Sequence, residues 1–270
     1  MSVWLPTAPC SSACLEDESA GVRVPRAVLR LTALLAVLGV GVVFLPFGRW
    51  LPEGGVRLFA RAVVRATGVR LHLTGAAPPS GGLLMVANHI SWMDVPLLAA
   101  VRPARMVAKK EIRRWPVAGF LAARAGVVFL DRDRLRALPG TVARLAAVLG
   151  RGGAVAVFPE GSTWCGRARG TFRRAAFQAA LDAGTPVQPV RLGYRLPDGT
   201  VSTAPAFVGD DTLFAALWRV VSARRIEAHV EIRPVLAAGH HTDRRSLAAA
   251  AQNASGRRAP HGPPVLPGGP

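Results

Sequence analysis

A histidine and an aspartate, five positions apart, are the residues of this sequence best suited to acid–base chemistry. They are His89 and Asp94, in the segment Asn88-His89-Ile90-Ser91-Trp92-Met93-Asp94. A neutral imidazole can take a proton from a hydroxyl near pH 7 if a carboxylate holds its other nitrogen as a donor. We therefore predict that His89 is a general base and that Asp94 orients it. A second role is open for Asp94, because Ser91-x-x-Asp94 is also a helix capping box.

Three apolar runs of the sequence each stop at a polar cluster. The runs and their clusters are residues 83–87 with Asn88-His89, residues 127–130 with Asp131-Arg132, and residues 154–158 with Pro159-Glu160-Gly161. In open α/β sheets the carboxyl ends of the strands form the ligand crevice. We expect these clusters to converge on one site, so that residues far apart in sequence act together.

Short apolar runs alternate with helical patterns from about residue 69 onward. The expected strands are residues 83–87, 127–130, 154–158, 187–192 and 226–232, and the expected helices are residues 95–101, 135–149 and 172–183. This alternation predicts an α/β domain in which helices flank a mostly parallel central sheet. Two antiparallel additions are indicated by the turn signal at residues 196–200 and by the apolar-polar alternation of residues 226–232.

The most hydrophobic stretch of the chain, residues 31–47, contains no charged residue. A helix of this length reaches roughly 25 Å, slightly less than the roughly 30 Å hydrocarbon core of a bilayer. No small-residue cleavage site follows it, since Pro46, Phe47, Arg49 and Trp50 stand there. We predict a membrane-associated helix that spans the bilayer or enters and returns. The alternative is a buried helix of a soluble domain.

Arginines at helical spacing follow this stretch. Arg57, Arg61 and Arg65 recur every four residues, which places a basic stripe beside an apolar face on a helix. The pattern suits a helix in the headgroup layer with its apolar side in the acyl boundary, and equally a packed helix with a solvated charged face. Because arginines flank the apolar stretch on both sides, a hairpin with both ends on the cytoplasmic side of the cell membrane fits best.

The domain organisation follows from these patterns. We expect a disordered leader at residues 1–26, a membrane-associated two-helix segment at 27–68, a catalytic domain at 69–252 and a disordered tail at 253–270.

The chain is strongly basic, with 34 Lys and Arg against 16 Asp and Glu and a net charge of +18. Such a charge favours an acidic partner, which is nucleic acid, anionic lipid or a phosphorylated substrate. A basic membrane-tethered binding protein without catalysis is therefore one alternative. Against a nucleic-acid partner, the chain has one tyrosine and no recognised nucleic-acid-binding motif. Lys109 and Lys110, its only lysines, either meet phosphate groups or face solvent.

Three cysteines, Cys10, Cys14 and Cys165, form no disulfide framework and match no zinc-binding spacing. We expect reduced thiols in a cytosol-facing protein, with no metal site. A thiolate at Cys165, near Arg167, is an alternative acyl acceptor.

Four ordered motifs resemble those of the glycerolipid acyltransferase family, typified by 1-acylglycerol-3-phosphate acyltransferases. They are Asn88-His89-x-x-x-x-Asp94, Gly126-Val127-Val128-Phe129-Leu130-Asp131-Arg132, Phe158-Pro159-Glu160-Gly161-Ser162 and Pro186-Val187-Gln188-Pro189-Val190. The resemblance covers roughly residues 69–192. It implies transfer of a fatty-acyl group from acyl-CoA or acyl carrier protein to a lysophospholipid hydroxyl at a membrane. It further implies no cofactor, no metal, no acyl-enzyme and an N-terminal two-helix membrane motif.

The resemblance also implies roles for individual residues. His89 and Asp94 match its catalytic pair, and Arg132 matches an arginine that binds the acceptor's phosphate through a planar, permanently charged fork. The motif containing Glu160, Gly161 and Ser162 shapes the acceptor site. Without the resemblance, Arg132 is a surface residue and residues 160–161 are an ordinary strand-to-loop turn.

One departure from the family pattern concerns the acceptor. The family commonly has Thr-Arg after Phe-Pro-Glu-Gly, whereas this chain has Ser162-Thr163, with the nearest arginines at positions 167, 169, 173 and 174. The first expected acceptor is 1-acylglycerol-3-phosphate. A lyso-ornithine lipid, or another lysolipid with a weaker need for phosphate recognition, is the alternative. An inactive lipid-binding relative is the third interpretation.

Overall fold

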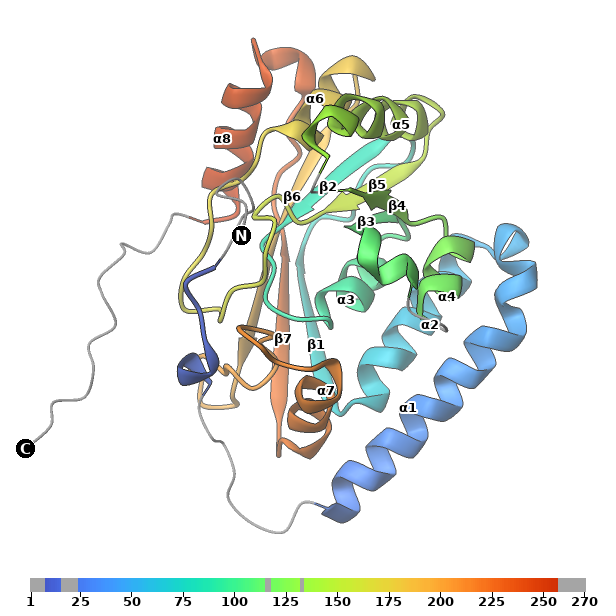
Figure 1. Cartoon of the computed structure of the whole chain (residues 1–270), viewed down its shortest axis with the longest axis vertical. Helices are drawn as coiled ribbons and strands as arrows, with labels where there is room; N and C mark the ends of the chain where they lie inside the picture. Colours follow the sequence, from blue (N-terminus) through green and yellow to red (C-terminus); the bar gives the residue numbers. More distant parts are fainter. Residues whose placement is uncertain (1–7, 16–23, 115–117, 132–133, 257–270) are drawn as a thin grey trace, which may run out of the picture.

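The computed structural model describes residues 8–15, 24–114, 118–131 and 134–256. Within these ranges, seven strands form one sheet in the order β1-β7-β6-β2-β5-β3-β4, with helices on both faces (Figure 1). The strands are β1 (Val69–Gly75), β2 (Leu83–Ala87), β3 (Arg105–Lys109), β4 (Val128–Leu130), β5 (Ala154–Val157), β6 (Val187–Arg195) and β7 (Ile226–Ile232). Neighbouring strands are parallel except β6 and β7, which are antiparallel. The predicted α/β class with a mostly parallel sheet is confirmed.

Two groups of helices cover the two faces of the sheet. One face packs against α2 (Glu53–Ala66), α3 (Asp94–Val101) and α7 (Leu213–Ser222), and the other against α5 (Leu138–Gly150), α6 (Ala175–Asp182) and α8 (Arg244–Ala254). A further helix, α4 (Ala118–Arg124), lies in the connection from β3 to β4. The side chains of β2 alternate between the two apolar clusters, and all five are buried. Burial on both faces explains why this strand is a continuous apolar run.

Two strands have no counterpart in the sequence prediction. β1 is an edge strand in which only Val69 is buried, and β3 begins at Arg105 and ends at Lys109. Neither is a long apolar run, because neither is deeply buried on both faces. Several predicted bounds also differ, since Phe158 follows β5 and the helices expected at 135–149 and 172–183 begin at Leu138 and Ala175.

The predicted antiparallel additions are present. Leu196 N donates to Thr200 O at 2.9 Å, and an antiparallel bridge joins Arg195 to Val201 beside this turn. β7 alternates between buried and half-buried residues and pairs antiparallel with β6 and parallel with β1.

The two ends of the described chain are more ordered than predicted. Residues 8–15, inside the predicted disordered leader, contain a short 3-10 helix (Ser12–Cys14) and a buried Cys10 that joins the apolar core. The prediction is wrong for this stretch because its small apolar side chains pack on the catalytic domain. α8 continues to Ala254 and Ser255 is buried, beyond the predicted start of the tail. Residues 1–7, 16–23 and 257–270 lie outside the described residues.

The apolar helix α1 (Val24–Phe44) runs along the outside of the domain (Figure 1). Only Ala27 and Leu34 are buried, whereas Leu29 is 71%, Val43 68% and Leu35 60% exposed. Among the described residues, it is the one helix long and apolar enough to cross a membrane. The alternative of a buried helix in a soluble domain is therefore wrong.

The next helix, α2, packs its apolar face against protein. Ala60, Val63 and Val64 are buried and Arg61 and Arg65 are exposed. Packing against α1 is also close, because a Cβ on Gly41 would lie 2.5 Å from the Phe59 ring. The buried side of α2 is thus not available to the acyl boundary, as in the alternative of a packed helix with a charged outer face, but Leu58 of the same helix is 70% exposed. The membrane association of α2 stays a prediction.

Candidate active site

The His89 imidazole and the Asp94 carboxylate are hydrogen-bonded, with 2.9 Å between Nδ1 and Oδ2. His89 follows β2 and Asp94 is the first residue of α3, so the strand-to-helix turn brings them together. The Asp94 side chain is fully buried, and the His89 side chain is 22% exposed. Because an ionised carboxylate only accepts, the ring carries its proton on Nδ1 and Nε2 is the nitrogen able to take a proton. The predicted contact is confirmed, and the role of His89 as the base stays a prediction.

Asp94 also holds the turn that contains His89. Its Oδ2 accepts hydrogen bonds from the backbone N–H groups of Ile90 at 2.6 Å and Ser91 at 2.9 Å. The hydrogen bond from Ser91 N to the Asp94 carboxylate is one of the two bonds of the predicted capping box. The second bond, from Asp94 N to Ser91 Oγ, is replaced by a hydrogen bond from Met93 N to Ser91 Oγ. The two roles considered for Asp94 therefore coexist, since one carboxylate orients the ring and fixes the turn.

The other Asp94 oxygen is held by Tyr194, a residue that sequence reasoning missed. Its hydroxyl donates to Asp94 Oδ1 at 2.6 Å. Burial, and then the nearby Asp94 charge, raise the pKa of Tyr194 well above its ordinary value, so the hydroxyl stays protonated and can donate. The available signal was weak: Tyr194 is the only tyrosine and continues the alternation of β6, two residues beyond the predicted end of that strand.

Glu160 follows β5, the neighbour of β2, and is only 3% exposed. Its Oε2 accepts from His89 N at 2.8 Å and its Oε1 from Gly170 N at 3.0 Å. Burial raises the pKa of Glu160 to about 7, against the opposite effect of these two hydrogen bonds. The predicted convergence of these two strand ends is thus present. Both carboxylate oxygens bind backbone, which makes Glu160 a positioning residue for His89, and its role toward the acceptor stays a prediction.

The segment after β5 holds the histidine from two further sides. The Phe158 ring stacks on the imidazole, with 3.9 Å between centroids and 9° between planes. Trp164 N donates to His89 O at 2.8 Å. Gly161 turns the chain between these contacts at φ 77°, a conformation that favours glycine. The Ser162 Oγ is buried and has no hydrogen-bond partner among the described residues, so its predicted part in substrate binding stays a prediction.

The remaining predicted residues lie toward the β3–β4 edge of the sheet. Lys109 ends β3, and Lys110 Nζ pairs with Asp131 Oδ2 at 2.8 Å, just after β4. Arg132 lies outside the described residues. β4 is three strands from β2, so the end that carries Asp131 lies about 14 Å from the end of β2 at about 4.8 Å per strand, and the end of β3, with the lysines, lies about 10 Å away. Neither strand adjoins the one that carries His89, and the phosphate-binding role of the lysines stays a prediction.

Comparison with known proteins decides the family. Residues 68–193 match the family model described as Acyltransferase. A lyso-ornithine lipid O-acyltransferase of Pseudomonas aeruginosa is 35% identical over 245 residues, which are 85% of this chain and 92% of the relative. The chain belongs to the acyltransferase family. A second relative, a 1-acyl-sn-glycerol-3-phosphate acyltransferase of Neisseria meningitidis serogroup B, is 36% identical over 188 residues, 69% of this chain and 73% of that protein.

A solved structure shows that this acyltransferase shares its fold with a known enzyme. The crystal structure of the 1-acyl-sn-glycerophosphate (LPA) acyltransferase PlsC from Thermotoga maritima matches with a TM-score of 0.65 and 19% identity. The match covers 87% of this chain and 95% of PlsC, so it includes more than the catalytic motifs.

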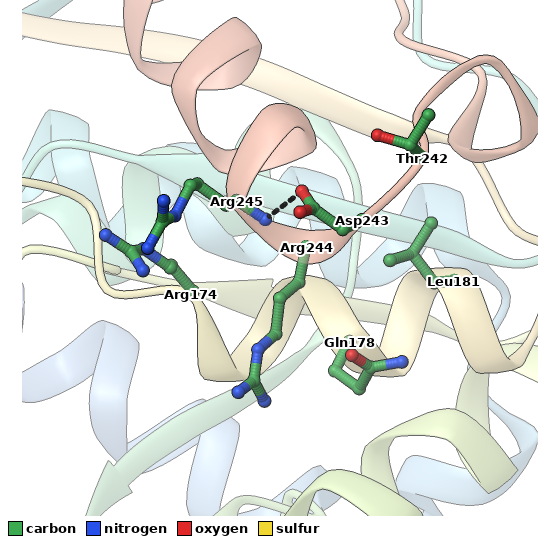
Figure 2. Close-up of a pocket in the computed structure, with 7 residues that line it drawn as sticks. All are labelled: Arg174, Gln178, Leu181, Thr242, Asp243, Arg244 and Arg245. Carbon is green, nitrogen blue, oxygen red and sulfur yellow. Dashed lines mark hydrogen bonds between the residues drawn. The ribbon is translucent and has the colours of Figure 1, made fainter.

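The acyltransferase also has a cavity of about 590 Å³ between α6 and the start of α8 (Figure 2). It is lined by Arg174, Gln178, Leu181, Thr242, Asp243, Arg244 and Arg245. The Asp243 carboxylate accepts from Arg245 N at 2.8 Å and Ser246 N at 2.7 Å, and so caps α8. Neither His89 nor Asp94 lines this cavity, although Arg174, one of the arginines that follow the Phe-Pro-Glu-Gly motif, does.

Of the four arginines that follow the Phe-Pro-Glu-Gly motif, Arg169 acts electrostatically on Glu160. Its NH1 donates to Ser255 O at 2.7 Å. Burial, and then the positive charge of Arg191, lower the pKa of Arg169. The acyltransferase thus has a partly buried guanidinium near the acceptor motif, although it is not at the position where the family commonly has one.

The fold gathers the three cysteines of the acyltransferase in one place. The sulfur atoms of Cys10, Cys14 and Cys165 all lie within 4.8 Å of one another. Burial raises the pKa of the Cys10 thiol to about 12. Burial acts in the same direction at Cys165, but backbone N–H groups of Arg167 and Ala168 and the two other thiols bring its pKa below the ordinary value. Cys165 is only 4% exposed, which disfavours it as an acyl acceptor for a lipid-sized donor.

Proposed function

We propose that this acyltransferase moves a fatty-acyl group from acyl-CoA or acyl carrier protein to the free hydroxyl of a lysolipid. The observation that carries the proposal is the pair of His89 and fully buried Asp94, joined at 2.9 Å, with Nε2 on the opposite side of the ring from the carboxylate. The family membership and both kinds of relative support the same reaction class.

In the proposed mechanism, His89 Nε2 takes the proton of the acceptor hydroxyl as its oxygen attacks the thioester carbonyl. Asp94 stabilises the imidazolium that forms, because its carboxylate lies against Nδ1. The tetrahedral intermediate then collapses, the carbon–sulfur bond breaks, and the imidazolium returns its proton to the departing thiolate. The products are the acylated lipid and the free thiol carrier, and the enzyme ends in its starting protonation state.

Two acceptors have specific support. The family resemblance and the Neisseria relative favour 1-acylglycerol-3-phosphate. The Pseudomonas relative, of which the chain covers 92%, favours a lyso-ornithine lipid, as does Ser162-Thr163 in the place of the family's Thr-Arg. Both acceptors present a hydroxyl, so the base chemistry is the same and the two differ in headgroup recognition.

The deciding experiment offers both lysolipids to the purified full chain with one labelled acyl group on CoA and on acyl carrier protein. We expect His89→Ala and Asp94→Ala each to lower turnover by well over tenfold. His240→Ala, which removes an exposed histidine, serves as the control. Folded His89→Ala protein that keeps full turnover contradicts the mechanism, and wild-type protein that acylates neither lipid favours an inactive lipid-binding relative.

The same assay tests Arg132. If the preferred acceptor carries a phosphate, Arg132→Ala raises the KM for that acceptor and leaves kcat nearly unchanged. The matched lyso-ornithine reaction changes little, because that headgroup has no phosphate for the guanidinium to bind. An equal effect on both acceptors contradicts a phosphate-specific role.

The proposed location is a membrane surface, with the catalytic domain on the cytoplasmic side. The exposed apolar helix α1 supports membrane association, and a water-soluble acyl-CoA or acyl carrier protein is available on the cytosolic side. The orientation is tested by protease accessibility of the catalytic domain in sealed inverted and right-side-out vesicles.

A further inference from the structure

The cysteine cluster joins two parts of the chain that are 151 or more residues apart in sequence. Cys10 and Cys14 come from the short N-terminal segment, and Cys165 from the loop that follows the Phe-Pro-Glu-Gly motif. Cys10 and Cys165 are buried and Cys14 is half-buried, so the cluster is closed on the protein side and partly open at Cys14. The catalytic mechanism uses none of these thiols.

Backbone N–H groups point at two of the three sulfurs. Cys165 N donates to Cys10 Sγ at 3.4 Å, and the backbone N–H groups of Arg167 and Ala168 donate to Cys165 Sγ. The loop can fold back on the sulfur in this way because Gly166 has φ 89°, where a side chain would be strained. A neutral thiol is a weak acceptor, whereas a thiolate attracts such donors strongly. The surroundings of Cys165 are therefore suited to negatively charged sulfur, whereas burial of Cys10 opposes it.

We propose that Cys10, Cys14 and Cys165 together bind one thiophilic metal ion, for which Zn²⁺ is the probe. Tetrahedral zinc with Zn–S bonds of about 2.3 Å places its sulfurs about 3.8 Å apart, so the cluster needs a contraction of no more than about 1 Å. Three cysteines leave a fourth coordination position, and the half-buried side at Cys14 gives water access to it. Each thiol releases its proton on binding, and the cation offsets the cost of the buried negative charge.

Two simpler accounts explain less of the geometry. A disulfide joins only two sulfurs and leaves the third, although all three sulfurs converge. Three thiols that merely fill space have no need for N–H donors directed at their sulfurs. Soft thiolate sets select zinc or copper(I) over hard cations such as Mg²⁺, which is why the proposal is restricted to thiophilic ions.

The bound ion would fasten the N-terminal segment to the active-site loop. Trp164, the neighbour of Cys165, donates its backbone N–H to His89 O at 2.8 Å. Glu160 and Gly170, on the two sides of Cys165 in sequence, are joined by a 3.0 Å hydrogen bond. The site therefore has a structural role, fixing a loop on which the histidine rests, and it supplies no group to the acyl transfer.

The test measures metal binding by the full chain, purified in detergent under reducing, oxygen-free conditions. We expect one Zn²⁺ per chain after dialysis, and tetrahedral thiolate absorption bands when Co²⁺ is used in its place. Cys10→Ser, Cys14→Ser and Cys165→Ser each weaken Zn²⁺ affinity by more than about tenfold, the least that losing even an outer-shell partner commonly costs. Ser12→Ala, in the same short helix, is the matched control and keeps the wild-type affinity.

A measurement on the unmodified chain covers the case in which a cysteine variant fails to fold. Zn²⁺ is expected to protect all three thiols from a thiol reagent, and a chelator to restore their reaction. Three results would each overturn the proposal. The first is equal zinc binding by wild-type and Cys14→Ser protein, and the second is the absence of stoichiometric zinc. The third is a single free thiol in chelated protein that was purified without a reducing agent. The last result would instead identify a disulfide. Because these measurements need no lipid substrate, they are independent of whether the proposed acyl transfer is found.

Discussion

At the scale of single residues, the site is organised around one buried carboxylate. Asp94 accepts hydrogen bonds from the His89 ring, from two backbone N–H groups and from the Tyr194 hydroxyl. A buried ionised carboxylate is costly unless such donors surround it. The same donors fix its position, so the imidazole is aimed by a group that cannot itself turn.

Tyr194→Phe tests this positioning. Loss of the hydroxyl leaves Asp94 Oδ1 without its 2.6 Å donor, so the carboxylate acts more strongly on His89 and favours the protonated ring. We expect turnover to fall severalfold, and the acidic limb of the kcat/KM profile to move to higher pH. Steady-state kinetics across pH measure both effects. Thr141→Val removes a buried hydroxyl on α5 and controls for a general loss of stability, and an unmoved limb would reduce Tyr194 to a packing role.

Glu160 makes the stability of the protein depend on pH. A carboxyl with a pKa of about 7 when folded and about 4.3 when unfolded binds its proton more tightly in the folded state. The contribution of Glu160 to the free energy of unfolding therefore falls as pH rises from about 4 to about 7, by up to about 4 kcal/mol, and is level above that. Glu160→Gln removes this slope, and denaturant unfolding at several pH values measures it.

Asp182→Asn, which neutralises a carboxylate on α6 that is bonded to Gln178 near the protein surface, is the control for Glu160→Gln. It is expected to keep the wild-type slope between pH 4 and 7. A Glu160→Gln variant with an unchanged slope would mean that Glu160 is ionised throughout this range and that its burial is offset by its hydrogen bonds.

At the scale of elements, α1 is attached to the domain by the side chain of Arg30 as well as by packing. The Arg30 guanidinium donates to Val221 O at 3.0 Å and Ala223 O at 2.6 Å, at the carboxyl end of α7. Carbonyls at a helix end lack partners within the helix and attract cations. Arg30 therefore links the apolar helix to the body that carries the active site.

Arg30→Met keeps most of the side-chain length and removes these hydrogen bonds. We expect a loss of about 1–3 kcal/mol in stability and faster hydrogen exchange at the end of α7, because its carbonyls lose a charged donor. Arg26→Met, one turn earlier on the same face region of α1, is the control. Equal exchange in the two variants would show that packing alone holds α1 in place.

The elements that sequence reasoning predicted are those with unambiguous burial. β2 and β5 are short apolar runs because helices cover both faces of the sheet at these strands. The polar residues that directly follow these runs include His89 and Glu160, which were therefore predicted as site residues. β1 was not predicted because most of it is exposed. The ordered conformation of residues 8–15 was not predicted because so short a run of mostly small side chains shows no periodicity. The partners Tyr194 and Cys10 could not be predicted, since each reaches its site through pairing of distant segments that no local pattern records.

At the scale of the whole molecule, apolar surface is concentrated on α1, outside the domain that binds it. Leu29, Leu35 and Val43 are each at least 60% exposed, and such a surface on a soluble protein marks a contact with another protein or a membrane. The +18 net charge adds attraction to anionic lipid. A membrane surface satisfies both properties at once and delivers the lipid acceptor proposed for the site.

Leu35→Lys with Val43→Lys tests the membrane assignment without disturbing the core. A lysine at the centre of a membrane helix costs about 2.5–3.5 kcal/mol, so vesicle binding is expected to fall by more than about tenfold. Co-sedimentation with anionic vesicles measures it, and Val235→Lys, at another exposed apolar residue, is the control.

The double variant should still turn over a detergent-dispersed lysolipid, because α1 contributes nothing to the His89 and Asp94 pair. Unchanged binding by the double variant would place the lipid contact on the basic surface of the domain instead of on α1.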